Sequence, residues 1–297
     1  PSRLPKSLLI IGAGAIGVEF ASFYQTLGVA VTLVEAAAQI LPTEDQEIAC
    51  LMQKALEKQG VIIKLESRVS KIDKETESIR ATVESAQGLF ETIDFERALS
   101  AVGVVANVED LGLEELGVNL AQGVIQTNGA GQTNISGLYA IGDVAGGPML
   151  AHKAAHEGVI CVDMIAGIAR EPLDKMKIPG CVYAYPQVAS VGLSEDKAKK
   201  LGIDIRVGRF PYRANGKALA LGEVEGLVKT IFNATSGALI GAHLIGAEAT
   251  ELIHGFLIAM NLETTEQELM ETVFPHPTLS ETMLESVYDA FDRAVHI

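Results

Sequence analysis

The chain has 297 residues, of which 48% are hydrophobic and 21% are charged. This length and composition predict a globular protein of about two domains rather than a disordered or fibrous chain. The formal net charge of −15 argues against nucleic acid as a partner, because phosphates would be repelled. The sequence contains no uninterrupted apolar run of transmembrane length, so no membrane partner is expected.

Cysteine and histidine are sparse. Cys50, Cys161 and Cys181 are scattered without a close pair, which indicates a reducing compartment and no disulfide framework. His152 and His156 stand four residues apart on an expected helix but lack further ligands, so the sequence predicts no metal site.

The first part of the chain alternates buried strands with helices. Strands are expected at 8–11, 29–35 and 61–67, and helices at 15–27 and 45–60. This βαβαβ order predicts a doubly wound parallel sheet.

The remaining elements are shorter and more mixed. Alternating apolar residues predict an antiparallel meander with strands at 68–73, 79–85 and 89–95. The other expected elements are strands at 97–103, 123–128 and 137–143, a helix at 149–167, a hairpin at 226–246 that turns at Asn233–Gly237, and helices around 247–260 and 278–292.

A glycine turn joins the first expected strand to the first helix. Gly12, Gly14 and Gly17 form the pattern G-x-G-x-x-G, which binds a pyrophosphate at a helix N-terminus when it lies between a strand and a helix. Glu35 ends the next strand, where a carboxylate accepts the hydroxyls of an adenosine ribose. The segment "EAAAQ" has no arginine for a 2′-phosphate, so NAD is favoured over NADP. FAD could occupy such a turn as well, and the alternative is a tight turn with a surface acid.

Two further motifs carry candidate residues. In "GLYAIGDVAGGPMLAHKAAHEG" (137–158), Asp143 follows an apolar stretch at a glycine-rich turn; it could bind a polyol or serve only as a turn residue or N-cap. In "VFPHPTLSE" (273–281), two prolines flank His276, a candidate general base. Glu281 could orient the imidazole or simply complete the capping box Thr278-x-x-Glu281.

Taken together, these motifs resemble those of the flavoprotein disulfide reductases, and among them the dihydrolipoamide dehydrogenases. The resemblance is carried by "IIGAGAIGVEFASFYQTLGVAVTLVE", "SAVG", "TNISGLYAIGDVAGGPMLAHKAAHEG" and "VFPHPTLSE", in that order along the chain. It implies that a dithiol reduces a protein disulfide, from which electrons pass to FAD and then to NAD⁺.

The resemblance also implies roles for single residues. His276 would be the catalytic base and Glu281 its orienting carboxylate. Ile16 and Glu19 would lie towards the nicotinamide, and Asp143 would bind the ribityl chain. The remaining implied NAD-binding residues are Gly12, Ala13, Gly14, Ala15, Gly17, Val18, Glu35, Val69 and Gly103, and the remaining implied FAD-binding residues are Met149, Leu150, Ala151 and His152.

The chain departs from the family pattern in two places. It carries one dinucleotide fingerprint and no C-x₄-C redox pair, so we expect the C-terminal portion of such an enzyme, without the N-terminal FAD domain and inactive alone. Val104 stands where many members have an arginine. The expected fold is α/β: a Rossmann-like NAD-binding domain at 1–118 with its meander, a partial FAD-contacting central domain at 119–178, and an α+β dimer-interface domain at 179–297.

The resemblance implies a homodimer that acts on dihydrolipoamide carried by an acyltransferase lipoyl domain. It also implies docking on the peripheral-subunit-binding domain of a 2-oxo acid dehydrogenase complex, in bacterial cytoplasm or the mitochondrial matrix. Other readings remain open: a soluble transhydrogenase, a glutathione-reductase-like or mercuric-reductase-like enzyme, or a non-catalytic module for NAD binding and dimerisation.

Overall fold

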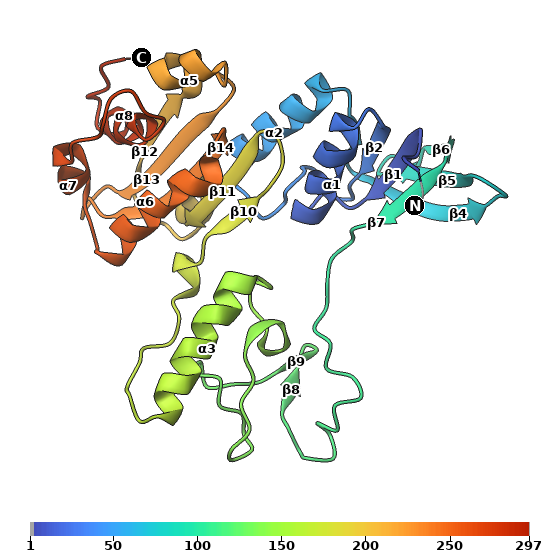
Figure 1. The fold of residues 1–297 in the computed structure, drawn as a ribbon, viewed down its shortest axis with the longest axis horizontal. Helices are drawn as coiled ribbons and strands as arrows, with labels where there is room; N and C mark the ends of the chain where they lie inside the picture. Colours follow the sequence, from blue (N-terminus) through green and yellow to red (C-terminus); the bar gives the residue numbers. More distant parts are fainter. Residues whose placement is uncertain (1–2, 297) are drawn as a thin grey trace. The chain divides into compact units, whose positions relative to one another are not determined.

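The structure, a computed structural model, describes residues 3–296 (Figure 1). The chain divides into two compact units. The first unit joins the chain up to Val102 with the chain from Pro179 onward, and the second is Gly103–Ile178.

The first unit begins with the expected parallel sheet, whose strand order is β3-β2-β1-β7. Its strands are β1 (Ser7–Ile11), β2 (Ala30–Val34), β3 (Ile62–Lys64) and β7 (Arg97–Ser100), and its helices are α1 (Ala15–Thr26) and α2 (Gln46–Lys58). The side chains of Leu8, Leu9 and Ile10 are all buried, as in a strand covered on both faces. The predicted doubly wound α/β arrangement is confirmed.

A three-stranded antiparallel meander follows, again as predicted. It consists of β4 (Ser67–Lys74), β5 (Ile79–Ser85) and β6 (Phe90–Phe95). Ala81, Val83 and Phe95 pack with Leu9 and Val34 of the parallel sheet in one small core. The meander is thereby fixed to the strands that end at the glycine turn and at Glu35.

The chain from Pro179 onward builds a second sheet, which is antiparallel and has the order β10-β11-β14-β13-β12. Its strands are β10 (Gly180–Val182), β11 (Gln187–Gly192), β12 (Ile205–Pro211), β13 (Leu227–Asn233) and β14 (Leu239–Gly246). The helical elements are α4 (Glu195–Lys200), η3 (Tyr212–Ala214), α5 (Gly216–Leu221), α6 (Ala249–Asn261), α7 (Glu266–Glu271) and α8 (Glu281–Ala290). The predicted hairpin is present as β13 and β14.

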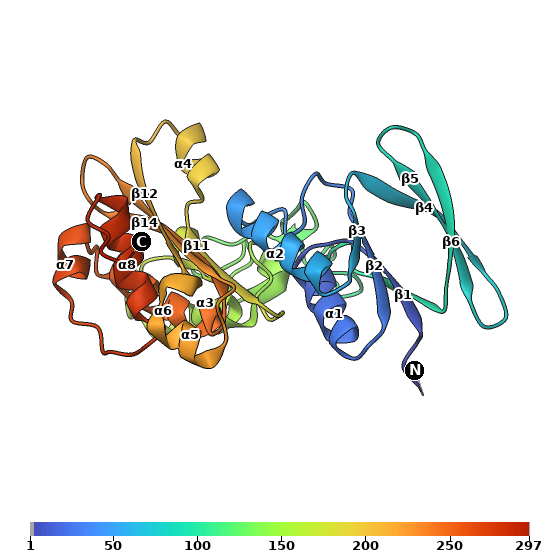
Figure 2. The same cartoon turned by 90° about the horizontal axis from the view of Figure 1, so that it is seen from above.

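The four-stranded parallel sheet and the five-stranded antiparallel sheet share a hydrophobic core that includes the helix α2. Met52 and Leu56 of α2 belong to the same buried cluster as Val188 and Ile245 of the antiparallel sheet. Figure 2 shows α2 between the parallel sheet and β11. The packing makes the half that contains the parallel sheet and the C-terminal half one compact body.

The second unit contains β8 (Leu120–Ala121), β9 (Val124–Ile125), the 3₁₀ turn η1 (Gly142–Ala145), the helix α3 (Ala151–Ile165) and the 3₁₀ turn η2 (Lys175–Lys177). The expected strand at 137–143 is wrong. Tyr139 forms only an isolated bridge with Gln132, and Gly137 and Gly142 have positive φ angles that break an extended run.

Within residues 3–296, no helix has both the length and the apolar character needed to cross a bilayer.

Candidate functional site

The glycine turn between β1 and α1 has the geometry that a pyrophosphate requires. A Cβ atom on Gly12 would collide with the backbone of Ala101, and one on Gly17 would collide with the carbonyl oxygen of Gly12. At Gly14 a Cβ atom would meet nothing within 4 Å. Two of the glycines are therefore needed for packing inside the protein, whereas Gly14 faces open space at the N-terminus of α1. First-turn N–H groups of a helix lack intrahelical acceptors and favour an anion there.

Glu35 follows the last residue of β2 and is tied to the glycine turn. Its Oε2 atom accepts a hydrogen bond of 2.7 Å from the backbone N–H of Ala13, and its Oε1 atom accepts one of 2.8 Å from Ala37. These bonds fix the orientation of the carboxylate. A carboxylate has about four lone-pair sites, so both oxygens can still accept ribose hydroxyls.

The other residues implied in NAD binding lie in different settings. Ile16 is exposed on α1, and Val69 is partly buried in β4, beside a register shift. Gly103 begins the second unit with a φ angle of +121°. The Oε1 atom of Glu19 accepts the backbone N–H of Tyr183 at 2.8 Å. Their contacts with a nucleotide stay predictions.

The features of this turn fit NAD. The open side of Gly14, the helix N-terminus and the fixed carboxylate of Glu35 are compatible with a pyrophosphate and a ribose at this turn. An additional phosphate on the ribose would face a carboxylate that is already held in place.

A second candidate site lies at the start of α8, in the antiparallel half of the same unit. The Nδ1 atom of His276 lies 2.9 Å from Oε1 of Glu281. The other oxygen of Glu281 accepts the backbone N–H of Thr278 at 2.9 Å. The hydroxyl of Thr278 donates to the carbonyl of Pro275, and Asn215 donates to the carbonyl of Thr278. The loop that carries the imidazole is thus fixed on both sides of the ring.

The sequence offered two interpretations of Glu281, as the group that orients the imidazole and as part of a capping box, and the structure bears on both. Glu281 accepts the Thr278 N–H, as the predicted capping box requires, but the helix begins only at Glu281 with Ser280 as its N-cap, so Thr278 is not the cap. The other oxygen of Glu281 holds the imidazole. Partial burial would raise the pKa of Glu281, but the hydrogen bonds from Thr278 and His276 outweigh it and lower that pKa. An ionised carboxylate only accepts hydrogen bonds, so Nδ1 must carry the hydrogen. In the neutral ring Nε2 is then the basic nitrogen, and the ring is exposed enough for it to meet a substrate.

The glycine-rich turn of the second unit rests on an ion pair between a buried lysine and a partly buried glutamate, which sequence reasoning missed. Lys153 is 2% exposed, and its Nζ atom donates to the carbonyl oxygens of Gly142 and Gly146 at 2.9 and 2.5 Å. Lys153 also pairs with Glu157 at 3.0 Å, and Glu157 accepts the N–H of Gly142 at 2.7 Å. The i,i+4 spacing of the two side chains on α3 was the available signal.

This pair positions the residues implied in FAD binding. Asp143 lies exposed in η1, between the two carbonyls that Lys153 holds. The segment Met149–His152 runs into the first turn of α3, with Met149 and Leu150 partly buried and the next two residues exposed. An exposed carboxylate on a rigid turn beside a helix N-terminus fits the polyol of a flavin cofactor, so the residues present fit one part of FAD. The assignment of each residue stays a prediction.

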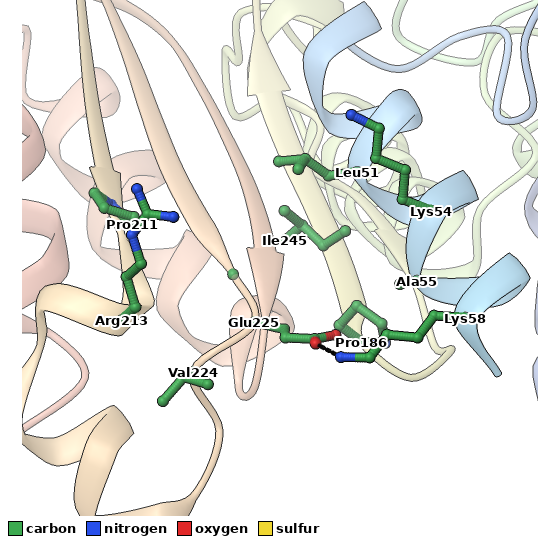
Figure 3. Close-up of a pocket in the computed structure, with 11 residues that line it drawn as sticks. Leu51, Lys54, Ala55, Lys58, Pro186, Pro211, Arg213, Val224, Glu225 and Ile245 are labelled. Carbon is green, nitrogen blue, oxygen red and sulfur yellow. Dashed lines mark hydrogen bonds and ion pairs between the residues drawn. The ribbon is translucent and has the colours of Figure 1, made fainter.

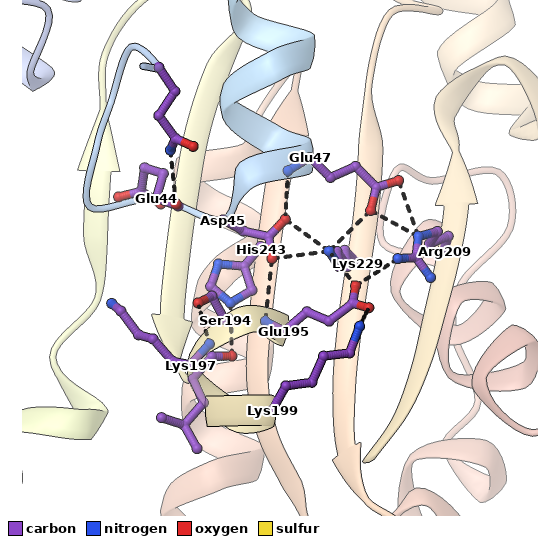
Figure 4. Close-up of polar contacts among 12 residues, drawn as sticks. Glu44, Asp45, Glu47, Ser194, Glu195, Lys197, Lys199, Arg209, Lys229 and His243 are labelled. Carbon is purple, nitrogen blue, oxygen red and sulfur yellow. Dashed lines mark hydrogen bonds and ion pairs between the residues drawn. The ribbon is translucent and has the colours of Figure 1, made fainter. Parts of the chain in front are cut away.

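A third polar cluster joins the start of α2 to the five-stranded antiparallel sheet and α4 (Figure 4). Lys229 lies 2.9 Å from Asp45 and 2.9 Å from Glu195, and both Lys229 and Asp45 are 3% exposed. Glu47 lies 3.0 Å from Lys229, and Arg209 pairs with Glu47 and Glu195. Burial opposes both charges, but the hydrogen bonds lower the pKa of Asp45 and raise the pKa of Lys229. These residues hold α2 and the antiparallel sheet together.

Among residues 3–296, the structure brings together no group of three or more His, Cys, Asp or Glu side chains that could hold a metal ion.

The fold and the first of these sites define a dinucleotide-binding protein of the doubly wound α/β class. The family model for pyridine nucleotide-disulphide oxidoreductases matches residues 1–158, and the model for the dimerisation domain of the same family matches residues 178–287. The chain belongs to the pyridine nucleotide-disulphide oxidoreductase family.

Curated relatives match along the whole chain. The chain is 58% identical over its full length to a dihydrolipoyl dehydrogenase from Rhizobium etli, of which it covers 62%. It is 52% identical over its full length to a dihydrolipoyl dehydrogenase from Zymomonas mobilis, of which it covers 64%. A mitochondrial dihydrolipoyl dehydrogenase from Pisum sativum is 41% identical over all of this chain, which covers 59% of that protein. The chain thus spans less than two thirds of the length of these relatives.

Solved structures show the same fold. LpdA from Mycobacterium tuberculosis matches with a TM-score of 0.89 and 28% identity, over 97% of this chain and 62% of that protein. The HOCl-induced flavoprotein disulfide reductase RclA from Escherichia coli matches with a TM-score of 0.88 and 27% identity, over 97% of this chain and 65% of that one.

Proposed function

We propose that the chain supplies the NAD-binding, central and dimer-forming parts of a dihydrolipoyl dehydrogenase. The observation that carries the proposal is the coupled geometry of His276, Glu281 and Thr278 in a chain that also holds the carboxylate of Glu35 in a fixed position beside the glycine turn. The relatives of similar sequence are dihydrolipoyl dehydrogenases. The reaction is oxidation of dihydrolipoamide by NAD⁺ through a protein disulfide and FAD.

In this proposal the first unit binds NAD⁺ at the glycine turn. The pyrophosphate lies over Gly14 at the start of α1, and Glu35 accepts the adenosine ribose hydroxyls. The Oε2 atom of Glu19 is not committed to Tyr183, so it can face the nicotinamide side of the site. The absence of an arginine in "EAAAQ" favours NAD⁺ over NADP⁺.

FAD, when bound, would accept electrons from the dithiol and pass a hydride to NAD⁺. Asp143 and the backbone of Met149–His152 would hold one part of it. Lys153 and Glu157 keep the turn of Asp143 rigid through the carbonyls and N–H group of its glycines. A rigid turn reduces the ordering cost of binding the polyol.

His276 acts on the substrate thiol as general base. With hydrogen on Nδ1 and Glu281 as acceptor, Nε2 takes the proton from the dihydrolipoamide thiol as the thiolate attacks the disulfide. Glu281 then stabilises the imidazolium that forms. The hydrogen bonds that Thr278 donates to Glu281 and to the carbonyl of Pro275 keep the ring and its carboxylate in their relative positions.

The proposed assembly is a homodimer formed through the C-terminal domain, in keeping with the match to a dimerisation domain. The proposed partners are the lipoyl domain of an acyltransferase and the peripheral-subunit-binding domain of a 2-oxo acid dehydrogenase complex. The negative net charge suits a basic docking module. Bacterial cytoplasm and mitochondrial matrix are the proposed compartments, since the relatives include bacterial and mitochondrial proteins.

The proposal is tested with a chimera that joins this chain to the segment of the Rhizobium etli relative that it does not match. The purified chimera is assayed for dihydrolipoamide-dependent reduction of NAD⁺, beside its His276→Gln variant and a His254→Gln control. We expect turnover that falls by about 10²–10⁴-fold in His276→Gln and is unchanged in the control. A folded, flavin-loaded chimera that reduces NADP⁺ or glutathione disulfide but leaves dihydrolipoamide untouched would contradict the proposal.

A further inference from the structure

A pocket of about 400 Å³ lies in the first unit, away from the glycine turn and from His276 (Figure 3). Its volume is in the range of about 300–1,000 Å³ that is usual for small-molecule sites. One wall belongs to α2 of the dinucleotide-binding half, and the other belongs to the antiparallel half. Its apolar lining consists of Leu51, Ala55, Pro186, Pro211, Val224 and Ile245.

The floor of the pocket is rigid and apolar. Ile245 and Ala55 are buried side chains in regular secondary structure, and Ile245 belongs to the core that the two halves share. Pro186 is also buried, and Pro211 is the last residue of β12. Such a floor accepts the apolar body of a ligand without rearrangement.

The rim of the pocket is positively charged. Lys54, Lys58 and Arg213 line it together with a single acid, Glu225, which pairs with Lys58. Figure 3 shows Lys54 and Arg213 on opposite sides of the pocket, with Ile245 between them. Within residues 3–296, neither Lys54 nor Arg213 has a carboxylate within ion-pair distance. Two uncompensated cations therefore face each other across an apolar floor, in a chain whose formal net charge is −15.

We propose that this pocket binds a small organic monocarboxylate with an aromatic or short aliphatic body. The apolar body lies on Ile245 and Ala55, and the carboxylate lies between Lys54 and Arg213. Arg213 suits a carboxylate because its guanidinium can donate two parallel hydrogen bonds. The site is independent of the proposed catalytic function, because it uses none of the residues assigned to NAD, to FAD or to proton transfer.

The position of the pocket gives a bound ligand a definite physical effect. The ligand contacts α2 on one side and β12 and β14 on the other, so it binds only while the two halves are packed together. A ligand that binds only the folded state raises the melting temperature. Occupancy therefore stabilises the junction that also contains Lys229 and Asp45.

The probe for the test is 1-naphthoate, with the uncharged 1-naphthamide as its matched control, titrated into the full chain by calorimetry. The variants Arg213→Glu and Lys54→Glu reverse the two charges, and Val224→Trp fills the mouth of the pocket. Lys200→Glu on α4 changes the net charge equally but lies outside the pocket.

We expect 1-naphthoate to bind once per chain, to raise the melting temperature, and to bind at least about tenfold more weakly to Arg213→Glu, Lys54→Glu and Val224→Trp. Binding to Lys200→Glu should match the unsubstituted chain, and 1-naphthamide should bind more weakly than 1-naphthoate. The proposal is overturned if Lys200→Glu weakens binding as much as Arg213→Glu, if binding survives Val224→Trp, or if NAD⁺ displaces the probe.

Discussion

Oε1 of Glu281 lies 2.9 Å from Nδ1 of His276, at the N-terminal end of the helix that Glu281 begins. The other oxygen of Glu281 holds the N–H of Thr278, so a single carboxylate both ends the loop and sets the tautomer of the ring. The charge that orients the base is therefore fixed by a local helix-start interaction. This relationship explains why the loop, the helix start and the candidate base occur together in nine residues.

We expect Glu281→Gln to reduce the dihydrolipoamide activity of the chimera by about 10²–10⁴-fold, because a neutral amide neither fixes the tautomer nor stabilises the imidazolium. Steady-state rates measured across pH provide the check, since loss of the carboxylate should also move the acidic limb of the profile. The exposed Glu77→Gln serves as control. Equal rates and equal pH profiles for all three proteins would rule out the orienting role.

Two substitutions in the glycine turn, Gly14→Ala and Gly17→Ala, should differ in their effects on NAD⁺ affinity and on the melting temperature. Gly14→Ala should leave the melting temperature nearly unchanged, because its Cβ atom meets nothing within 4 Å. It should weaken NAD⁺ binding by at least about tenfold, because the added methyl group occupies the approach of the pyrophosphate. Gly17→Ala should instead destabilise the fold, because its Cβ atom would collide with the carbonyl of Gly12. Thermal unfolding and calorimetry separate the two effects, and equal NAD⁺ affinity in Gly14→Ala would be incompatible with this site.

Lys153→Met should destabilise the second unit by about 3 kcal/mol, because it removes the buried cation of the pair with Glu157 and leaves the carbonyls of Gly142 and Gly146 without their donor. The control is Lys175→Met, in η2, whose lysine is exposed. Hydrogen exchange at Gly142, whose N–H donates to Glu157, reports on this turn directly. Unaltered exchange at Gly142 in Lys153→Met would show that the pair does not hold the turn.

Acid should weaken the junction between α2 and the antiparallel sheet. Burial would raise the pKa of Glu195, but hydrogen bonds from Lys199 and Lys229 outweigh it and lower the pKa from 4.5 to about 2. A carboxyl group with a depressed folded-state pKa contributes stability that is present above its unfolded pKa and is lost as the pH falls through the folded value. Urea unfolding of the chain should therefore show stability falling between about pH 4.5 and pH 2.

Glu195→Gln should flatten that decline, because the substituted side chain has no proton to take up. The exposed Asp196→Asn, on the same helix, should retain the full acid dependence. Identical pH profiles for Glu195→Gln and the unsubstituted chain would assign the acid sensitivity to other groups.

Local patterns in the sequence predicted much of the fold. The helix expected at 15–27 is α1 (Ala15–Thr26), and the meander and the hairpin formed as expected, because apolar periodicity and turn glycines are local signals. The strand expected at 137–143 failed for a local reason as well. Its apolar residues suggested a strand, but two glycines with positive φ angles interrupt it.

No local pattern in the sequence predicted the ion pairs that join distant segments. Lys229 and Asp45 are separated by 184 positions. No motif or periodicity predicts that a lysine in a strand will pair with the N-cap residue of a helix so far away in the sequence. The same holds for the pocket at α2, whose walls come from five separate stretches of chain. The sequence did place Glu35 and the glycine turn together, because their spacing follows from the βαβ unit.

The most direct test of the central claim is calorimetric titration of NAD⁺ and NADP⁺ into this chain, beside Glu35→Ala and the control Glu77→Ala. We predict that NAD⁺ binds to the unsubstituted chain and to Glu77→Ala, that NADP⁺ does not bind, and that Glu35→Ala loses at least about tenfold in NAD⁺ affinity. Equal affinity for the two nucleotides, or NAD⁺ binding that is unchanged by Glu35→Ala, would contradict the assignment of the glycine turn and Glu35 as a site for NAD.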